Sequence, residues 1–329
     1  MSMVHTTATV ANRNFTMQKR HIGRTGLRVS TVGLGGNNFG WKIDQEASNT
    51  VVAKALDLGV TLFDTADRYG TSAGESELVL GKALGQRRKD AVLLTKFGVD
   101  LVDYSRNSSR RYVMSAAEGS LRRLDTDWID IYMIHWPDYA TPMEETLRAL
   151  DDLVRSGKVR YIACSNLEPW RIADAVWISK HFNLDTFICA QDQYSLLNRD
   201  AEKHLIPALE HYGMGLSPYY PLASGLLTGK YSGGAVPAQG RLKENFLRLG
   251  NQFLNERNLR IVNALEEFCR ARSHTLLELA VSWLLARPVV SSVICGATRP
   301  EQVEQNVKAG DWVLSPEDLA QIDELTKPA

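Results

Sequence analysis

The sequence predicts an α/β fold, a (β/α)8 TIM barrel with an N-terminal β-hairpin that caps the barrel floor. From residue 31 onward, short β-branched runs alternate with longer stretches of helical periodicity, which is the rhythm of parallel βαβ units. Eight such runs fit a closed barrel better than an open sheet, and 329 residues suit one barrel domain. We expect the strands at Thr31–Leu34, Val60–Asp64, Ala91–Lys96, Ile129–His135, Val159–Ser165, Thr186–Gln191, Gly215–Tyr219 and Ser291–Cys295.

The hairpin is predicted from Lys19–Ile22 and Arg28–Ser30, which flank a turn signal at residues 24–26. Capping residues, glycine stops and flanking prolines indicate several of the helices. These are a helix opened by Asp44 or Ser48 and running to Leu58, one opened by a capping box of Ser115 and Glu118 and running to Leu124, and the segments Glu144–Ser156, Thr275–Ala286 and Pro316–Lys327.

Outside these elements, residues 1–18 read as a flexible extension, so we expect one domain over residues 19–329. Two long irregular stretches, Phe97–Arg111 and Thr228–Asn255, follow the third and seventh strands. Loops of that length are usually functional, and barrel enzymes use the face to which these loops belong.

Composition excludes several classes of function. Lysine plus arginine equals aspartate plus glutamate at 38 each, so no nucleic-acid or membrane partner is expected. No apolar run approaches the roughly 20 residues of a spanning helix. The four cysteines are scattered, which argues against a metal site and favours a reducing, cytoplasmic location. The expected partner is a small molecule, and the sequence leaves the oligomeric state undetermined.

Four polar residues end or follow three consecutive predicted strands: Asp64, Tyr69, Lys96 and His135. Each alone has an ordinary structural explanation, such as a helix cap, a packed ring or a solvated side chain. Together they suit carbonyl reduction, which needs a proton donor to the developing alkoxide. A tyrosine can donate that proton if a nearby ammonium stabilises its phenolate, a carboxylate holds the ammonium, and a histidine assists at the substrate oxygen.

A resemblance supports this interpretation. The segments VGLGGNNFG (32–40), FDTADRYG (63–70), LLTKFG (93–98) and IHWPD (134–138) resemble the signature blocks of the aldo-keto reductase superfamily. Later blocks agree in order, namely IACSN (162–166), QDQY (191–194), YYPLASGLLTGKY (219–231) and ICGATRPEQVEQN (294–306). The resemblance spans about residues 19–326. It implies that Asp64, Tyr69, Lys96 and His135 form the catalytic tetrad of an active enzyme.

The resemblance also implies a nicotinamide cofactor, NADPH, with NADH as the alternative. It assigns to cofactor binding Gly35, Gly36, Asn37, Asp64, Ser165, Asn166, Gln191, Tyr219, Tyr220, Leu222, Ser224, Gly225, Lys230, Gly296, Ala297, Thr298, Arg299, Gln302 and Asn306. Two choices stay open: Gln191 or Gln193 at the carboxamide, and Tyr219 or Tyr220 at the nicotinamide ring. Better-known animal relatives have lysine and arginine where this chain has Gly296 and Gln302, which weakens a strict NADPH preference, whereas Arg299 supports it.

The expected substrate pocket is aromatic, formed by Phe39, Trp41, Phe97 and Trp136. Little sequence follows the last expected helix, which is typical of bacterial-type members with a short C-terminal tail and predicts an open site. The expected function is reduction of aldehydes or ketones to alcohols. The alternatives are a sugar or secondary-alcohol dehydrogenase working in the oxidative direction, and a cofactor-sensing regulatory subunit.

Overall fold

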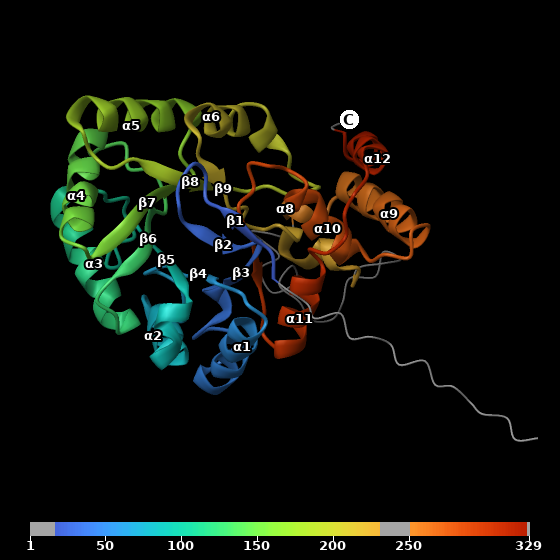
Figure 1. Cartoon of the computed structure of the whole chain (residues 1–329), viewed down its shortest axis with the longest axis horizontal. Helices are drawn as coiled ribbons and strands as arrows, with labels where there is room; N and C mark the ends of the chain where they lie inside the picture. Colours follow the sequence, from blue (N-terminus) through green and yellow to red (C-terminus); the bar gives the residue numbers. More distant parts are fainter. Residues whose placement is uncertain (1–16, 231–250, 328–329) are drawn as a thin grey trace, which may run out of the picture.

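The architecture is a parallel barrel surrounded by helices, seen in a computed structural model that describes residues 17–230 and 251–327 (Figure 1). Most of the predicted extension, residues 1–16, and much of the second long stretch, residues 231–250, lie outside the described residues. The eight parallel strands are β3 Val32–Gly35, β4 Leu62–Asp64, β5 Val92–Phe97, β6 Ile129–Ile134, β7 Val159–Ser165, β8 Phe187–Gln191, β9 Gly215–Leu216 and β10 Val293–Gly296.

Barrel closure depends on β9, the shortest strand. The hydrogen-bonded order runs β10-β3-β4-β5-β6-β7-β8-β9, and every neighbouring pair is parallel. The Leu216 N–H then donates to the Val289 carbonyl at 2.7 Å, and the Ser291 N–H donates to the Leu216 carbonyl at 2.9 Å. These bonds close the ring between the last two strands, which confirms the predicted fold class.

Alternation along each strand divides the apolar side chains into two cores. On β4, Leu62 packs inside the barrel while Phe63 packs outward, and on β5 Leu94 is inside while Leu93 is outside. The outer core joins the strands to the helices, and the inner core fills the barrel. This alternation decides which strand-end residues reach the interior.

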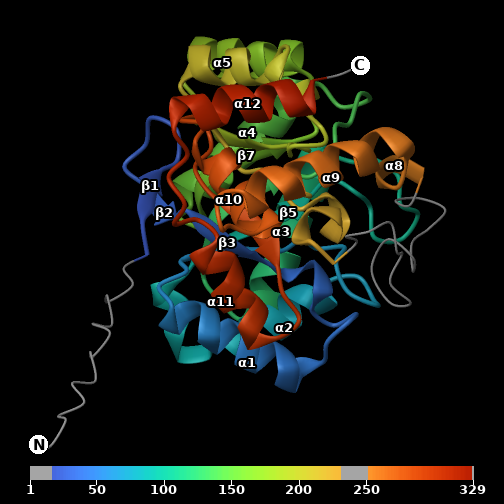
Figure 2. The same ribbon diagram turned by 90° about the vertical axis from the view of Figure 1, so that its right-hand side faces the viewer.

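The N-terminal hairpin, β1 Lys19–His21 and β2 Arg28–Ser30, seals the barrel floor. Ile22 and Val29 are fully buried in the inner core, together with side chains from six barrel strands. The Arg20 guanidinium donates to the carbonyls of Leu285 and Val290 at 2.7 and 3.0 Å. Figure 2 shows the hairpin at one end of the barrel and α8 at the opposite end.

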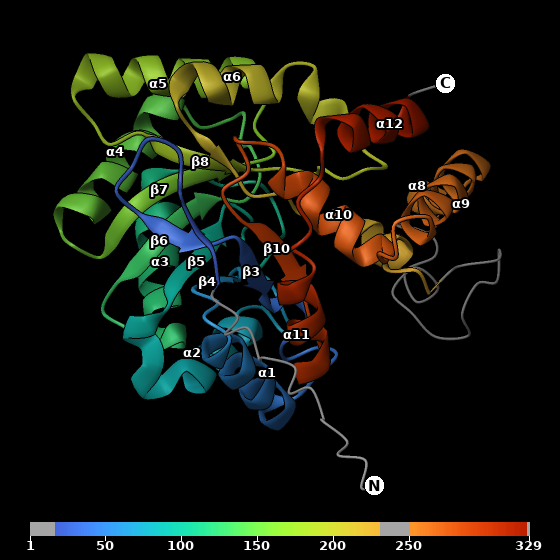
Figure 3. The same ribbon diagram turned by 45° about the vertical axis from the view of Figure 1, so that its right-hand side comes forward.

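The helices pack outside the strands. Helix α11, near the end of the chain, lies beside α1, the first helix, and so completes the ring of helices (Figure 3). The α-helices are α1 Gln45–Asp57, α2 Glu75–Leu84, α3 Arg110–Leu124, α4 Met143–Arg155, α5 Pro169–Phe182, α6 Leu205–Tyr212, α8 Asn251–Phe253, α9 Glu256–Arg270, α10 Leu276–Leu285, α11 Pro300–Lys308 and α12 Pro316–Thr326. The 3-10 turns are η1 Gly36–Asn38, η2 Gly85–Asp90, η3 Asp200–Glu202 and η4 Ala223–Thr228.

One helix start predicted from the sequence is wrong. Helix α3 begins at Arg110, after Ser109, so Ser115 lies inside it rather than at its cap. Glu118, the expected partner in that capping box, instead accepts from the Lys158 ammonium. The spacing of a capping box therefore occurs here inside a helix and not at its start.

No helix in residues 17–230 and 251–327 is long and apolar enough to cross a membrane.

We expect Gly23→Ala to destabilise the barrel floor. Gly23 has φ +52°, and a Cβ atom there would lie 2.5 Å from the Gly213 carbonyl oxygen. A left-handed non-glycine residue costs about 1–3 kcal/mol, and the close contact adds to that cost. Chemical denaturation would measure the loss. Gly26→Ala is the matched control, since nothing lies within 4 Å of its Cβ position; equal stabilities of the two variants would contradict this account of the turn.

Candidate active site

The predicted chemical residues share one face of their strands. On β4, Leu62 faces the barrel interior, so Asp64, two residues further on, faces it too. On β5, Leu94 and Lys96 face the interior for the same reason. On β6 the inward residues Ile131 and Met133 lead to His135, one residue past the strand. The apolar inner core therefore ends in three polar side chains at the carboxyl ends of the strands, opposite the hairpin.

Lys96 and Asp64 form a buried ion pair. The Lys96 Nζ atom lies 2.5 Å from Asp64 Oδ1 and 2.8 Å from the Thr65 carbonyl oxygen. The Gln191 Nε2 atom donates to the same Asp64 oxygen at 2.9 Å. Burial lowers the pKa of Lys96 from its ordinary value, while the attraction of Asp64 opposes that shift. The Asp64 carboxylate thus favours the charged form of Lys96, although the Lys96 side chain has no contact with solvent.

Tyr69 lies over this pair. It follows β4 in a turn that its own backbone closes, because the Tyr69 N–H donates to Ala66 and the Tyr69 carbonyl accepts from Ser76. The Lys96 ammonium lies 5.1 Å from the centre of the Tyr69 ring. The His135 ring meets Tyr69 edge to face, with the centroids 5.6 Å apart. The structure therefore brings the four predicted residues together.

His135 is a buried imidazole in a cationic environment. Burial lowers its pKa well below the ordinary value, and the charges of Lys96, Arg68 and Arg106 lower it further. The ring is therefore neutral near pH 7 and carries one N–H donor. Its Nδ1 atom is buried and has no hydrogen-bond partner within the described part of the chain.

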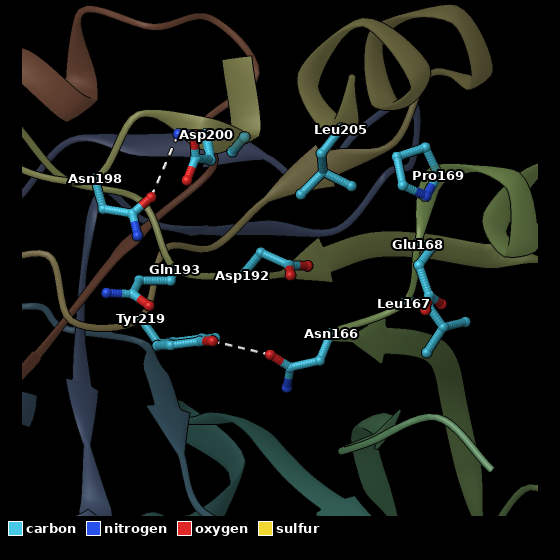
Figure 4. Close-up of a pocket in the computed structure, with 11 residues that line it drawn as sticks. Asn166, Leu167, Glu168, Pro169, Asp192, Gln193, Asn198, Asp200, Leu205 and Tyr219 are labelled. Atoms are coloured by element: carbon cyan, nitrogen blue, oxygen red, sulfur yellow. Dashed lines mark hydrogen bonds between the residues drawn. The ribbon is translucent and has the colours of Figure 1, made fainter. Parts of the chain in front are cut away.

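A second group of polar residues lies beside the first, after β7 and β9. The Asn166 Nδ2 atom donates to Ser165 Oγ and to the His135 carbonyl, both at 2.9 Å. The Tyr219 hydroxyl donates to Asn166 Oδ1 at 2.9 Å, as Figure 4 shows. Asn166 has φ +59°, so this network holds it in a conformation that few non-glycine residues adopt.

The two choices left open by the sequence have distinct surroundings. Gln191 is buried against Asp64, whereas the Gln193 side chain accepts from Gln252 at 3.0 Å. Tyr219 bonds to Asn166, whereas the Tyr220 ring packs against Phe253 with the centroids 5.9 Å apart. Gln191 and Tyr219 are therefore the members of each pair that face the tetrad.

The residues expected at the phosphates form two turns. In the first, around η4, Leu222 leads into Ser224 with φ +56° and Gly225 with φ +100°, and the Lys230 side chain folds over Gly225. The buried Ser224 hydroxyl has no hydrogen-bond partner among the described residues. A polar atom buried in this way calls for a ligand or water to pair with it.

The second turn joins β10 to α11. Thr298 donates its N–H and its hydroxyl to Gln302 Oε1 at 2.7 and 3.1 Å, and Asn306 donates to the Gly296 carbonyl. Arg299 precedes Pro300, the first residue of α11, and is exposed. Ala297, between Gly296 and Thr298 in the sequence, is buried. Because Gly296 pairs with Gly35, this turn lies beside Gly35, Gly36 and Asn37 after β3.

Only two of the four predicted pocket aromatics are accessible. Trp41 is 43% exposed, and Trp136 is half-buried with its ring stacked on His135. Phe39 and Phe97 are fully buried in the outer core, so the structure does not put them at the pocket rim. The reason for Phe97 is alternation, because it follows the inward-facing Lys96 and therefore points toward the helices.

Several residues near the site were not predicted. The Thr65 carbonyl accepts from Lys96, and Asn38 donates to the Ala297 carbonyl between the turns that follow β3 and β10. Asp192 lines a pocket of about 340 Å³ outside Asn166 and Tyr219, and burial raises its pKa to about 7. No motif marks a backbone carbonyl as a ligand, whereas Asp192 could have been suspected from its position one residue past β8.

No group of three or more histidine, cysteine, aspartate or glutamate side chains in the described ranges could hold a metal ion.

Fold and site together define the class, a (β/α)8 barrel with its polar side chains gathered at the carboxyl ends of the strands. The chain belongs to the aldo/keto reductase family, whose model matches residues 31–327.

It is 38% identical over 320 residues to an L-glyceraldehyde 3-phosphate reductase of Escherichia coli O157:H7, covering 94% of this chain and 92% of the relative. It is 37% identical over 316 residues to a probable voltage-gated potassium channel subunit beta of Oryza sativa subsp. japonica, covering 93% and 96%. An uncharacterized oxidoreductase of Bacillus subtilis is 33% identical over 320 residues, covering 94% and 96%. The family and these relatives support an oxidoreductase.

We expect Asp64→Asn to destabilise the protein strongly. The substitution leaves the Lys96 ammonium buried without its counter-charge, and breaking a buried ion pair in this way costs about 3–5 kcal/mol. Urea denaturation at pH 7 would measure the loss.

The matched control removes both charges, combining Asp64→Asn with Lys96→Met. Because no isolated ion then remains in the barrel, we expect the double variant to be more stable than Asp64→Asn alone. A double variant that is less stable than the single one would show that the ion pair is not what matters there.

Proposed function

We propose that this protein reduces aldehydes or ketones to alcohols with NADPH, with Tyr69 as the proton donor. The observation that carries the proposal is the position of a buried ammonium, Lys96, 5.1 Å from the centre of the Tyr69 ring. A cation held there favours the phenolate that remains after proton transfer.

The other two members of the tetrad prepare this step. Asp64 holds the Lys96 ammonium at 2.5 Å, and its attraction opposes the lowering of the Lys96 pKa by burial. His135 is neutral, so its N–H can donate to the substrate oxygen and orient the carbonyl toward the Tyr69 hydroxyl. A reduced nicotinamide, when bound, supplies the hydride that the carbonyl carbon accepts.

The residues present fit a nicotinamide dinucleotide. Ser165, Asn166 and Gln191 offer hydroxyl and amide groups suited to a carboxamide, and the Tyr219 ring stands beside them for stacking. The turn at Ser224 and Gly225 would hold the pyrophosphate with Lys230. Thr298, Arg299 and the start of α11 would hold the 2′-phosphate, since a helix N-terminus and a guanidinium both favour an anion.

Two alternatives rest on specific observations. The same tetrad serves alcohol oxidation with Tyr69 as the base, so the protein would act as a dehydrogenase if product and cofactor ratios favour that direction. The relative named as a channel subunit beta supports a regulatory role. A turnover screen of aldehydes, ketones and sugars with both cofactors separates these, because cofactor binding with no turnover of any substrate favours the regulatory role.

We expect Tyr69→Phe to lower kcat for carbonyl reduction by at least about 10²-fold, because the proton donor is gone. The dissociation constant for NADPH, measured by fluorescence titration, should change little. Tyr161→Phe is the control, since it removes a hydroxyl from the far half of β7. Unchanged turnover in Tyr69→Phe would refute the assigned role.

We expect Arg299→Ala to raise KM for NADPH about 10-fold and to leave KM for NADH nearly unchanged, because only NADPH carries the 2′-phosphate. Steady-state kinetics with both cofactors would measure this. Lys308→Ala, at the other end of α11, is the matched loss of a cation. Equal changes in the two KM values for Arg299→Ala would remove the phosphate assignment.

A further inference from the structure

Two arginines that the proposed reaction does not use, Arg68 and Arg106, act by their charge on His135. Arg68 directly precedes Tyr69 and is half-buried. Arg106 lies in the connection between β5 and α3, and its guanidinium is 4.7 Å from the centre of the Trp136 ring. Because Trp136 stacks on His135, the second cation lies one ring away from the catalytic histidine.

Arg68 is not held by a specific bond. Within residues 17–230 and 251–327, its guanidinium makes no hydrogen bond and no ion pair. The adjacent Asp67 is 1% exposed, and neither of its carboxylate oxygens has a partner among the described residues. Burial raises the pKa of Asp67 well above its ordinary value, which favours its uncharged form.

Two carboxylates in the described part of the chain near His135 already have partners of their own. Asp64 is committed to Lys96 and Gln191. The Asp138 carboxylate accepts hydrogen bonds from Ser108 and from Thr141. The charged groups that shift the pKa of His135, namely Lys96, Arg68 and Arg106, are all cations.

We propose that Arg68 and Arg106 bind an anionic group of the substrate, so that the preferred substrates are carbonyl compounds bearing a carboxylate or a phosphate monoester. A guanidinium presents a planar set of N–H donors that matches either anion. The indole of Trp136 covers the apolar part of such a molecule while the carbonyl reaches Tyr69 and His135. This inference rests on the proposed carbonyl reduction and adds the substrate class to it.

The test compares substrates that differ only in charge. For the wild type, kcat/KM is measured with 4-formylbenzoate against 4-formylbenzamide, and with glyceraldehyde 3-phosphate against glyceraldehyde. We expect at least a 10-fold preference for the charged member of one pair, and which pair shows it distinguishes carboxylate from phosphate. The preference should fall as ionic strength rises, because exposed charges are screened.

The variants Arg68→Gln and Arg106→Gln should each raise KM for the preferred anion about 5- to 20-fold and leave the neutral partner within about 2-fold. Arg87→Gln is the control, since it removes an exposed arginine on η2, whose partner is Asp57. Equal losses on charged and neutral substrates, or a wild type with no preference in either pair, would overturn the proposal.

A binding measurement separates this inference from the proposed function. Terephthalate resembles 4-formylbenzoate but offers no carbonyl to reduce, so its affinity by calorimetry reports the anion site without turnover. Arginine-dependent binding in a protein that reduces no aldehyde would refute the proposed function and keep the anion site. Binding that Arg68→Gln and Arg106→Gln leave unchanged would refute the anion site.

Discussion

The ion pair between Asp64 and Lys96 is the interaction on which the site depends. An ammonium without solvent is unfavourable unless a carboxylate and further acceptors surround it, and here Asp64 and the Thr65 carbonyl provide them. The pair lies at the level where the apolar side chains inside the barrel end. Gln191 reaches the same carboxylate, which couples β8 to β4 across the interior.

Much of the fold and of the site could be predicted from local patterns in the amino-acid sequence. The alternation of strand and helix predicts the barrel, and the predicted strands match the observed ones to within a few residues, apart from the two-residue β9. Convergence of Asp64, Lys96 and His135 follows because parallel strands bring their carboxyl ends to one rim. The hairpin could also be predicted from local sequence, because a turn signal at residues 24–26 lies between two short segments ahead of the first barrel strand.

Other features could not be predicted because they depend on contacts between distant segments. Phe39 looks like a pocket aromatic, yet it is buried beside helices whose packing the local pattern does not specify. Ser115 and Glu118 have the spacing of a cap, but α3 had already begun at Arg110. Phe97 is different, because strand alternation beside Lys96 already indicated its outward direction. The burial of Asp67 without a hydrogen-bond partner among the described residues also emerges only from the packing of distant segments.

The hairpin that closes the barrel floor ties the beginning of the chain to its end. Arg20 bonds to the carbonyls of Leu285 and Val290, which are 265 and 270 residues further along. During synthesis on the ribosome, those partners emerge only after most of the strands have been made. The N-terminal hairpin therefore reaches its final position late. During most of translation, the floor of the nascent barrel is open and its apolar interior is exposed. Contacts of such long sequence separation slow folding, so this protein should depend on protection from aggregation while it is being made.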